Sequence, residues 1–202
     1  FDDMSIGALA GDIVDIARAR KLRPAIVNGW SLGGAVAVEA AHRLGKDAVG
    51  LILTCAASPR YVQAADFPYG GVREDVLGMQ DAILADRAGF FKGLSAGVCA
   101  KDVGQPAIDW MWSIFMDSGP QAIKAMLALA DLDQRSILAG LDIPVLSIIG
   151  SEDGVVPPQI GEQAAACAQH GKLARFEGCG HAPFIEDGPG YIKTLLEFAQ
   201  DV

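Results

Sequence analysis

The chain has 202 residues, of which 51% are hydrophobic, 20% charged and 7% aromatic, a composition typical of a globular protein with an alanine- and glycine-rich core. Its 16 basic and 25 acidic residues give a formal net charge of −9, which argues against nucleic acid or an anionic membrane as a partner, because both repel an acidic surface. No apolar run reaches the length of a membrane span, so a small neutral or apolar molecule is the better partner.

The first predicted elements lead into a strand-to-helix turn. Residues 6–22 are expected to form a helix because apolar side chains recur at helical spacing, at Ile6, Leu9, Ile13 and Ile16. A short apolar strand follows from Pro24 to Asn28, and a helix of small residues is expected to begin at Ala35. Between the strand and this helix lies Gly29-Trp30-Ser31-Leu32-Gly33-Gly34.

This hexapeptide predicts a nucleophile elbow. A turn from strand to helix within a few residues crowds Ser31, so the positions two before and two after it, Gly29 and Gly33, should lack a side chain. The turn would expose the Ser31 hydroxyl and leave the N–H of Leu32 at a helix N-terminus, where it can donate to a developing oxyanion. The alternative is an ordinary glycine-rich turn, but the flanking strand and helix are the context that the motif requires.

A second buried strand is expected from Val49 to Thr54, and residues 59–142 then read as successive helices. The chain therefore divides into core residues 1–58, a helical insertion at 59–142 and core residues 143–202. Apolar clusters in the insertion, one with Phe91 and Leu94 and one with Trp112, either line an acyl pocket or form the insertion's own core. Trp30 is a further candidate substrate contact because it adjoins the nucleophile.

The last two predicted strands end in loops that carry candidate partners for the serine. Pro144–Gly150 reads as a buried strand and leads into a polar loop with Asp153, the candidate acid, and Glu152, its rival. The run from Lys172 to Glu177 opens into the loop that contains His181, the candidate base. The order serine, acid, histidine is the one that a nucleophile-elbow hydrolase requires.

On these motifs the chain resembles the alpha/beta-hydrolase superfamily. Gly-Trp-Ser-Leu-Gly-Gly and His-Ala-Pro-Phe make it most similar to carboxylesterases such as the pimeloyl carrier-protein methyl-ester esterases. The resemblance implies an α/β fold with a mostly parallel sheet flanked by helices, and it identifies the insertion at 59–142 as a helical lid. It also implies that Ser31 is the nucleophile, His181 the general base, Asp153 its orienting partner and the Leu32 N–H one oxyanion donor.

The resemblance further implies several strands ahead of the elbow, and one loop there would donate the second oxyanion N–H. These N-terminal strands are absent from this sequence, so we expect a second polypeptide or an omitted segment to supply them. A homodimer is left open. A signal peptide is not assessable without that segment.

The function expected is that of a serine hydrolase that cleaves a carboxylic ester or lactone of a small, largely apolar substrate through an acyl-enzyme. The alternatives are a carbon–carbon bond hydrolase, a perhydrolase or an acyltransferase on the same triad, and a non-catalytic small-molecule receptor. We expect no cofactor and no metal, because the four cysteines, Cys55, Cys99, Cys167 and Cys179, lack zinc or redox spacing. Free thiols indicate a reducing compartment, and hence the cytoplasm.

Overall fold

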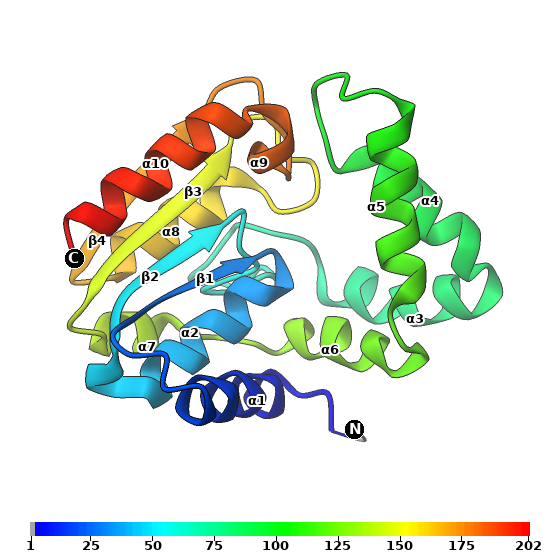
Figure 1. Cartoon of the computed structure of the whole chain (residues 1–202). Coiled ribbons are helices and arrows are strands. Elements are labelled where there is room, and N and C mark those ends of the chain that lie inside the picture. The colour runs from blue at the N-terminus through cyan, green and yellow to red at the C-terminus, as the bar shows by residue number, and fades with distance from the viewer. Residues whose placement is uncertain (1–2) are drawn as a thin grey trace.

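A computed structural model describes residues 3–202 of the chain, in which four parallel strands form one sheet with helices on both faces (Figure 1). The strands lie side by side in chain order and are β1 (Ala25–Trp30), β2 (Ala48–Thr54), β3 (Pro144–Gly150) and β4 (His170–Phe176). All three strand pairings are parallel. The predicted α/β class with a parallel sheet flanked by helices is confirmed.

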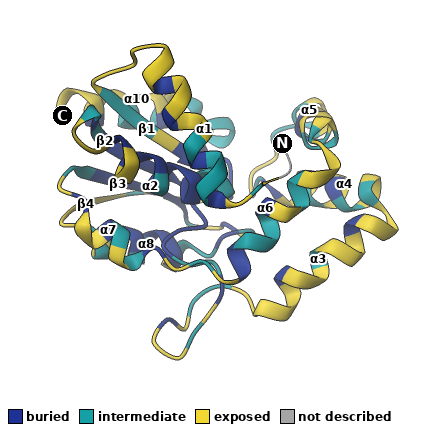
Figure 2. Cartoon of the chain, turned by 90° about the horizontal axis from the view of Figure 1, so that it is seen from below, coloured by how far each residue is buried: buried dark blue, intermediate teal, exposed yellow. Residues whose placement is uncertain are grey.

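Alternating side chains of the strands build a separate core on each face of the sheet. On β2, Leu51 and Leu53 belong to the larger core, whereas Ile52 belongs to the smaller one. The larger core is covered by α1 (Ile6–Ala19), α2 (Leu32–Leu44), α7 (Arg135–Gly140) and α8 (Pro158–Cys167). The smaller core lies under α10 (Gly188–Gln200), which follows the short helix α9 (Pro183–Glu186). Figure 2 shows that buried residues are concentrated in β2, β3 and α2, in the middle of the molecule.

Helix α1 is present, but it packs with a different face from the one predicted. Its N-cap is Ser5, whose hydroxyl accepts the Ala8 N–H at 3.1 Å. The buried residues are Ile6, Ala10, Val14 and Ala17. Ile13 and Ile16, expected in the core, are 43% and 55% exposed. The small side chains at positions 10 and 17 allow α1 to approach α2 closely, and this packing decides the orientation.

The elbow is tighter than the sequence predicts. Strand β1 continues to Trp30, and α2 begins at Leu32, so one residue, Ser31, makes the whole turn. The strand therefore ends two residues later than the predicted Asn28, and the helix begins three residues earlier than the predicted Ala35. The last strand also begins two residues earlier than predicted, at His170.

The predicted insertion contains five helices among the described residues. They are α3 (Arg73–Ala85), α4 (Arg87–Gly97), α5 (Gln105–Asp117), α6 (Ile123–Leu127) and α7, with short 3-10 turns at Pro120–Ala122 and Ala128–Ala130. Helices α3 to α6 stand beside the sheet (Figures 1 and 2), whereas Leu138 of α7 is fully buried in the larger core. We therefore use the word lid for α3–α6 alone, as a name for their position beside the sheet. Within residues 3–202, none of the helices is both long and apolar enough to cross a membrane.

Candidate active site

The carboxyl ends of three parallel strands meet at one edge of the sheet, and the three predicted catalytic residues follow these ends (Figure 1). Ser31 directly follows β1, Asp153 lies three residues after β3, and His181 lies in the loop after β4. Because all the strands of the sheet are parallel, residues far apart in the chain are brought to the same edge. Each of the three therefore occupies a position that the fold fixes.

Ser31 has a backbone conformation that is rare for a residue with a side chain, with φ 56° and ψ −126°. Its N–H donates to the Thr54 carbonyl at 3.1 Å, and its own carbonyl accepts from Ala57 and Gly34, both at 2.9 Å. These bonds hold the strained turn, which connects β1 to α2, against the end of β2 and the residues that follow it. The N–H of Leu32, the first residue of α2, makes no hydrogen bond within the described part of the chain. It is thus free to donate to an oxyanion at the positive end of the helix dipole.

Close packing requires two glycines near Ser31, and only one of them, Gly29, is among the two that the motif suggests. A Cβ on Gly29 would lie 2.2 Å from the Gly33 carbonyl oxygen, and one on Gly34 would lie 2.3 Å from Ala56 Cβ. A Cβ on Gly33 would meet nothing within 4 Å. The prediction was therefore right for Gly29 and wrong for Gly33, whose own backbone is what excludes a side chain from Gly29.

Asp153 and His181 form a buried pair. His181 Nδ1 lies 2.8 Å from Asp153 Oδ2, and the two side chains are 3% and 1% exposed. The other carboxylate oxygen accepts the N–H groups of Val155 and Val156 at 2.8 and 2.9 Å. A carboxylate fixed in this way selects the tautomer in which Nδ1–H donates to it and leaves Nε2 as the basic nitrogen. The rival acid, Glu152, is exposed.

Cys55 also contacts this pair, so the three side chains must be considered as metal ligands. The ligand atoms of Cys55, Asp153 and His181 lie within 4.8 Å of one another. However, Asp153 already binds His181 Nδ1, and burial followed by the negative charge of Asp153 raises the pKa of the Cys55 thiol far above its ordinary range. The arrangement fits an acid–base pair with a neutral thiol beside it.

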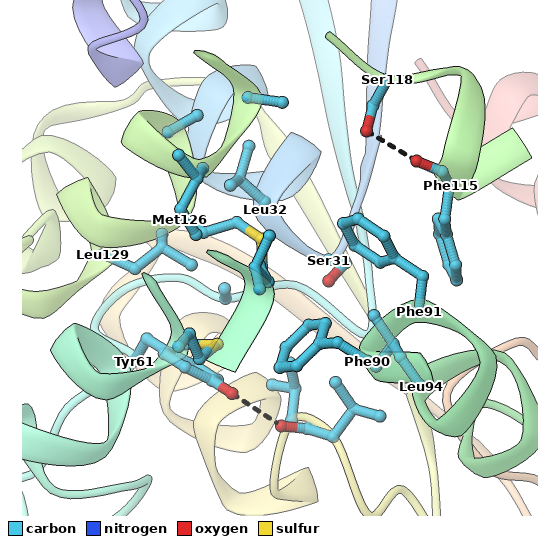
Figure 3. A pocket seen from close by; sticks show the side chains of 18 of the residues that line it. Ser31, Leu32, Tyr61, Phe90, Phe91, Leu94, Phe115, Ser118, Met126 and Leu129 are labelled. Carbon is cyan, nitrogen blue, oxygen red and sulfur yellow. Dashed lines mark hydrogen bonds between the residues drawn. The ribbon is translucent and has the colours of Figure 1, made fainter. Parts of the chain in front are cut away.

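A cavity of about 450 Å³ opens between the sheet edge and the lid. Ser31 and His181 both line it, together with Trp30 and Leu32 from the core and Phe91 and Leu94 from the lid. Figure 3 shows Ser31, Leu32, Phe91 and Leu94 of this set. Its wall is almost entirely apolar, with contributions from Phe90, Phe115, Met126 and Leu129. An apolar cavity that contains a serine and a histidine can hold an acyl chain beside a nucleophile.

The structure separates the predicted substrate contacts into two groups. Trp30, Phe91 and Leu94 line the cavity. Trp30 is fixed by its indole N–H, which donates to the His181 carbonyl at 2.7 Å, and its ring lies 5.2 Å from the imidazole. The prediction for Trp112 was wrong, because this residue does not line the cavity. Its indole N–H donates to the Ala88 carbonyl at 3.2 Å, so Trp112 joins α5 to α4.

Other cavity residues were not predicted from the sequence. Tyr61 lines the cavity and donates its hydroxyl to the Val155 carbonyl at 3.1 Å. Burial, and then the negative charge of Asp153, raise the pKa of this phenol. Arg87 and Met126 line the cavity from the lid. Only tertiary contacts identify these positions, because single residues of this kind belong to no sequence motif.

Comparison with known proteins gives relatives over nearly the whole chain. The model of the alpha/beta hydrolase family matches residues 1–193. The chain is 28% identical to the AB hydrolase superfamily protein YisY of Bacillus subtilis, in an alignment that covers 95% of this chain and 72% of that protein. It is 30% identical to a pimeloyl-[acyl-carrier protein] methyl ester esterase of Vibrio cholerae, over 94% of the chain and 77% of that protein. The pimeloyl-[acyl-carrier protein] methyl ester esterase of Aromatoleum aromaticum is 34% identical, over 86% of this chain and 72% of that protein.

Solved structures share the same fold. The esterase EaEST of Exiguobacterium antarcticum superposes with a TM-score of 0.93 and 26% identity, covering 98% of this chain and 74% of that one. A bromoperoxidase of Bacillus anthracis gives a TM-score of 0.91 at 20% identity, covering 98% and 75%. At that identity the second likeness concerns the fold alone.

Proposed function

Because the chain belongs to the alpha/beta hydrolase family, we propose that it hydrolyses carboxylic esters with Ser31 as the nucleophile. The observation that carries the proposal is the buried pair of Asp153 and His181, in which His181 lines the same apolar cavity as Ser31. The names of the relatives, which include several methyl ester esterases, support an ester as substrate. The apolar wall favours a small, largely apolar one.

The reaction proceeds in two acyl-transfer steps. Ser31 Oγ attacks the ester carbonyl carbon while His181 Nε2 accepts the hydroxyl proton, and the tetrahedral intermediate collapses as the alcohol leaves with that proton. Water then attacks the acyl-enzyme and loses a proton to His181. The second tetrahedral intermediate collapses as His181 returns this proton to Ser31 Oγ, and the carboxylic acid is released. Asp153 holds the imidazole in the required tautomer and stabilises its charged form.

Electrostatic stabilisation comes from the start of α2. The N–H of Leu32 donates to the oxyanion of the tetrahedral intermediate, and one such donor contributes about 3–4 kcal/mol to catalysis in well-studied hydrolases. Because Leu32 directly follows Ser31, we propose that the hydroxyl and this N–H act on the same carbonyl group. We also propose that the enzyme works in the cytoplasm, since its four cysteines are free thiols.

The test uses aryl esters of increasing acyl length and one lactone, with wild type and Ser31→Ala. We expect Ser31→Ala to lower kcat by about 10³-fold or more while the protein keeps its fold. A fluorophosphonate probe should label the wild type at Ser31 and leave the variant unlabelled. Ester hydrolysis by folded Ser31→Ala at the wild-type rate would overturn the assignment. A folded wild type that binds esters but neither hydrolyses them nor reacts with the probe would indicate a receptor.

A further inference from the structure

The cavity wall contains one cationic side chain. Among the described residues that line the cavity, Arg87 is the one with a permanent charge, and its neighbours on the wall are apolar apart from a few hydroxyls and His181. Arg87 is half-buried at the start of α4. Its guanidinium carbon lies 4.8 Å from the centroid of the Phe91 ring. A charge placed against an apolar wall is costly unless a partner compensates it.

The partners of Arg87 within the protein use one nitrogen only. Nη2 donates to the Ser118 carbonyl at 2.6 Å, to the Ser118 hydroxyl at 3.0 Å and weakly to the Phe115 carbonyl at 3.4 Å. Ser118 and Phe115 lie beside Phe91 at the cavity (Figure 3). Nε and Nη1 make no hydrogen bond in residues 3–202, and no carboxylate there forms a salt bridge with Arg87. Three N–H groups of a guanidinium are therefore available to a ligand.

Helix α4 places Arg87 and the catalytic base at opposite ends of one wall. The carbonyl of Val98, the C-cap of α4, accepts the His181 N–H at 2.7 Å. Arg87 precedes Val98 by eleven residues, which corresponds to about 16 Å along a helix. Phe91 and Leu94, between these two ends, line the cavity. A ligand that reaches from the base to Arg87 must be an extended chain.

We propose that Arg87 binds an anionic group at the far end of the substrate, so that the preferred substrates are esters whose acyl chain ends in a carboxylate. This inference rests on the proposed ester hydrolysis at Ser31. A carboxylate compensates the unpaired charge and accepts the free N–H groups, and both interactions are strengthened by the surrounding apolar wall. The methylene chain between the two ends fills the space along Phe91 and Leu94.

The test compares monomethyl esters of straight-chain dicarboxylic acids, in a series of increasing length, with the dimethyl esters of the same acids. The dimethyl esters keep the scissile group and the chain but have no charge. We expect wild type to prefer the half-ester at the best length. Arg87→Met should lower kcat/KM for the half-ester by about 10- to 100-fold, the usual effect of losing hydrogen bonds to a charged group. The loss should appear in KM, because Arg87 lies far from the reacting atoms.

Three further variants distinguish this role from that of a structural link between α4 and α5. Arg87→Lys should keep part of the preference for half-esters. Lys92→Met removes an exposed charge from the same helix and should leave the preference unchanged. In the Ser31→Ala background, calorimetry should show that Arg87→Met weakens half-ester binding by the same factor without affecting the dimethyl ester.

An equal loss for charged and neutral esters in Arg87→Met would overturn the inference and leave Arg87 as a structural link. Wild type that hydrolyses both esters equally well, with dependence on Ser31, would also overturn it while leaving the proposed ester hydrolysis intact. Failure of the proposed hydrolysis would appear differently, as no turnover of any ester. The calorimetric comparison would then still decide whether Arg87 binds the carboxylate.

Discussion

The strained backbone of Ser31 is supported by its neighbours. A left-handed conformation at a residue with a side chain costs about 1–3 kcal/mol. Here the cost is offset by hydrogen bonds from both sides of the turn, to Thr54 and from Ala57. The same turn brings Gly29 against the Gly33 carbonyl. The two glycines therefore contribute differently, and this difference can be measured.

We predict that Gly29→Ala destabilises the protein and that Gly33→Ala does not. The Cβ of alanine at position 29 would overlap a backbone carbonyl that cannot move without distorting α2, and such overpacking costs about 1–3 kcal/mol. At position 33 the Cβ has open space in a helix, where alanine is favoured over glycine by up to about 1 kcal/mol. Urea unfolding of the two variants beside wild type gives the free energies of unfolding. Equal destabilisation by both changes would contradict the packing described here.

For single residues, the sequence predicted which side chains form the candidate site better than it predicted how closely residues pack. The positions of Ser31, Asp153 and His181 follow from motif spacing and chain order, and the structure brings the last two into contact. The sequence did not indicate which glycine is crowded, because that depends on how tightly β1 turns into α2. It also did not indicate Arg87, whose position on the cavity depends on how α4 packs on α5.

The loop that contains His181 is joined to the residues that follow α4. The link is Glu186, at the end of α9, whose Oε1 accepts three backbone N–H groups, those of Ala100, Lys101 and Gly180, at 2.7, 2.9 and 2.9 Å. Its Oε2 accepts the Gly180 N–H as well, at 2.8 Å. A Cβ on Gly180 would lie 2.6 Å from the Ala100 nitrogen, so the two segments touch directly. Glu186 thereby links the loop that contains His181 to the residues that follow α4.

We predict that Glu186 positions His181 and that its loss affects turnover more than substrate binding. Glu186→Ala leaves three backbone N–H groups without their acceptor, so the His181 loop loosens while the apolar cavity wall remains. We expect kcat to fall by about tenfold or more with KM little changed, and Glu186→Gln, which keeps one carbonyl oxygen, should restore part of the rate.

The control for Glu186 is Glu197→Gln, which removes an exposed carboxylate from α10. Steady-state kinetics over a pH series separates an effect on the base from a general loss of stability, because a loosened imidazole also shifts the pH profile of kcat. A lower unfolding temperature with unchanged kcat for the folded protein would contradict a positioning role and leave Glu186 as a structural residue.

Element boundaries were predicted less well than element types. The helical insertion and the buried strands followed from periodicity. Helix α1, however, packs with a neighbouring face, which keeps Ile6 but buries Ala10, Val14 and Ala17 instead of Ile13 and Ile16, because small side chains allow two helices to approach closely. Trp112 was assigned to the cavity by its apolar character, whereas its indole N–H found a backbone acceptor on α4. Tertiary contacts decided both cases.

In the whole molecule the two ends of the predicted insertion meet at one place on the core. The fully buried side chain of Gln134 joins them: its Oε1 accepts the Ser58 hydroxyl and its Nε2 donates to the Ala35 carbonyl, both at 2.8 Å, while its backbone N–H donates to Pro59. Ser58 and Gln134 are far apart in the chain, and no sequence pattern pairs them. The sequence could therefore predict that an insertion exists but not how it is fastened.

A group of charges surrounds this junction on the solvent side. Asp133 accepts hydrogen bonds from Arg135 at 2.6 Å and from Arg60 at 3.2 Å, and Arg135 also binds Asp66 at 2.8 Å. Hydrogen bonds from Arg135, the largest cause, lower the pKa of Asp133 from 3.8 to about 2. The same guanidinium lowers the pKa of Asp66. Residues 60 and 66 lie at the start of the insertion and residues 133 and 135 near its end, so the group reinforces the contact that Gln134 makes beneath it.

These shifts predict how stability depends on pH. A carboxyl whose pKa is lower in the folded state stabilises that state above its unfolded pKa, and this contribution is lost as the pH falls through the folded pKa. For Asp133 the loss should occur between about pH 4 and pH 2. The free energy of unfolding of Asp133→Asn should therefore be lower than that of wild type at pH 7, by about 1 kcal/mol or less because the pair is partly exposed. The free energies of the two proteins should converge near pH 2.

The matched control is Asp81→Asn, which removes an exposed carboxylate from α3 and should show no such convergence. Urea unfolding from pH 7 to pH 2 measures this directly, and a difference between wild type and Asp133→Asn that stays constant over the range would show that the charges do not fasten the insertion.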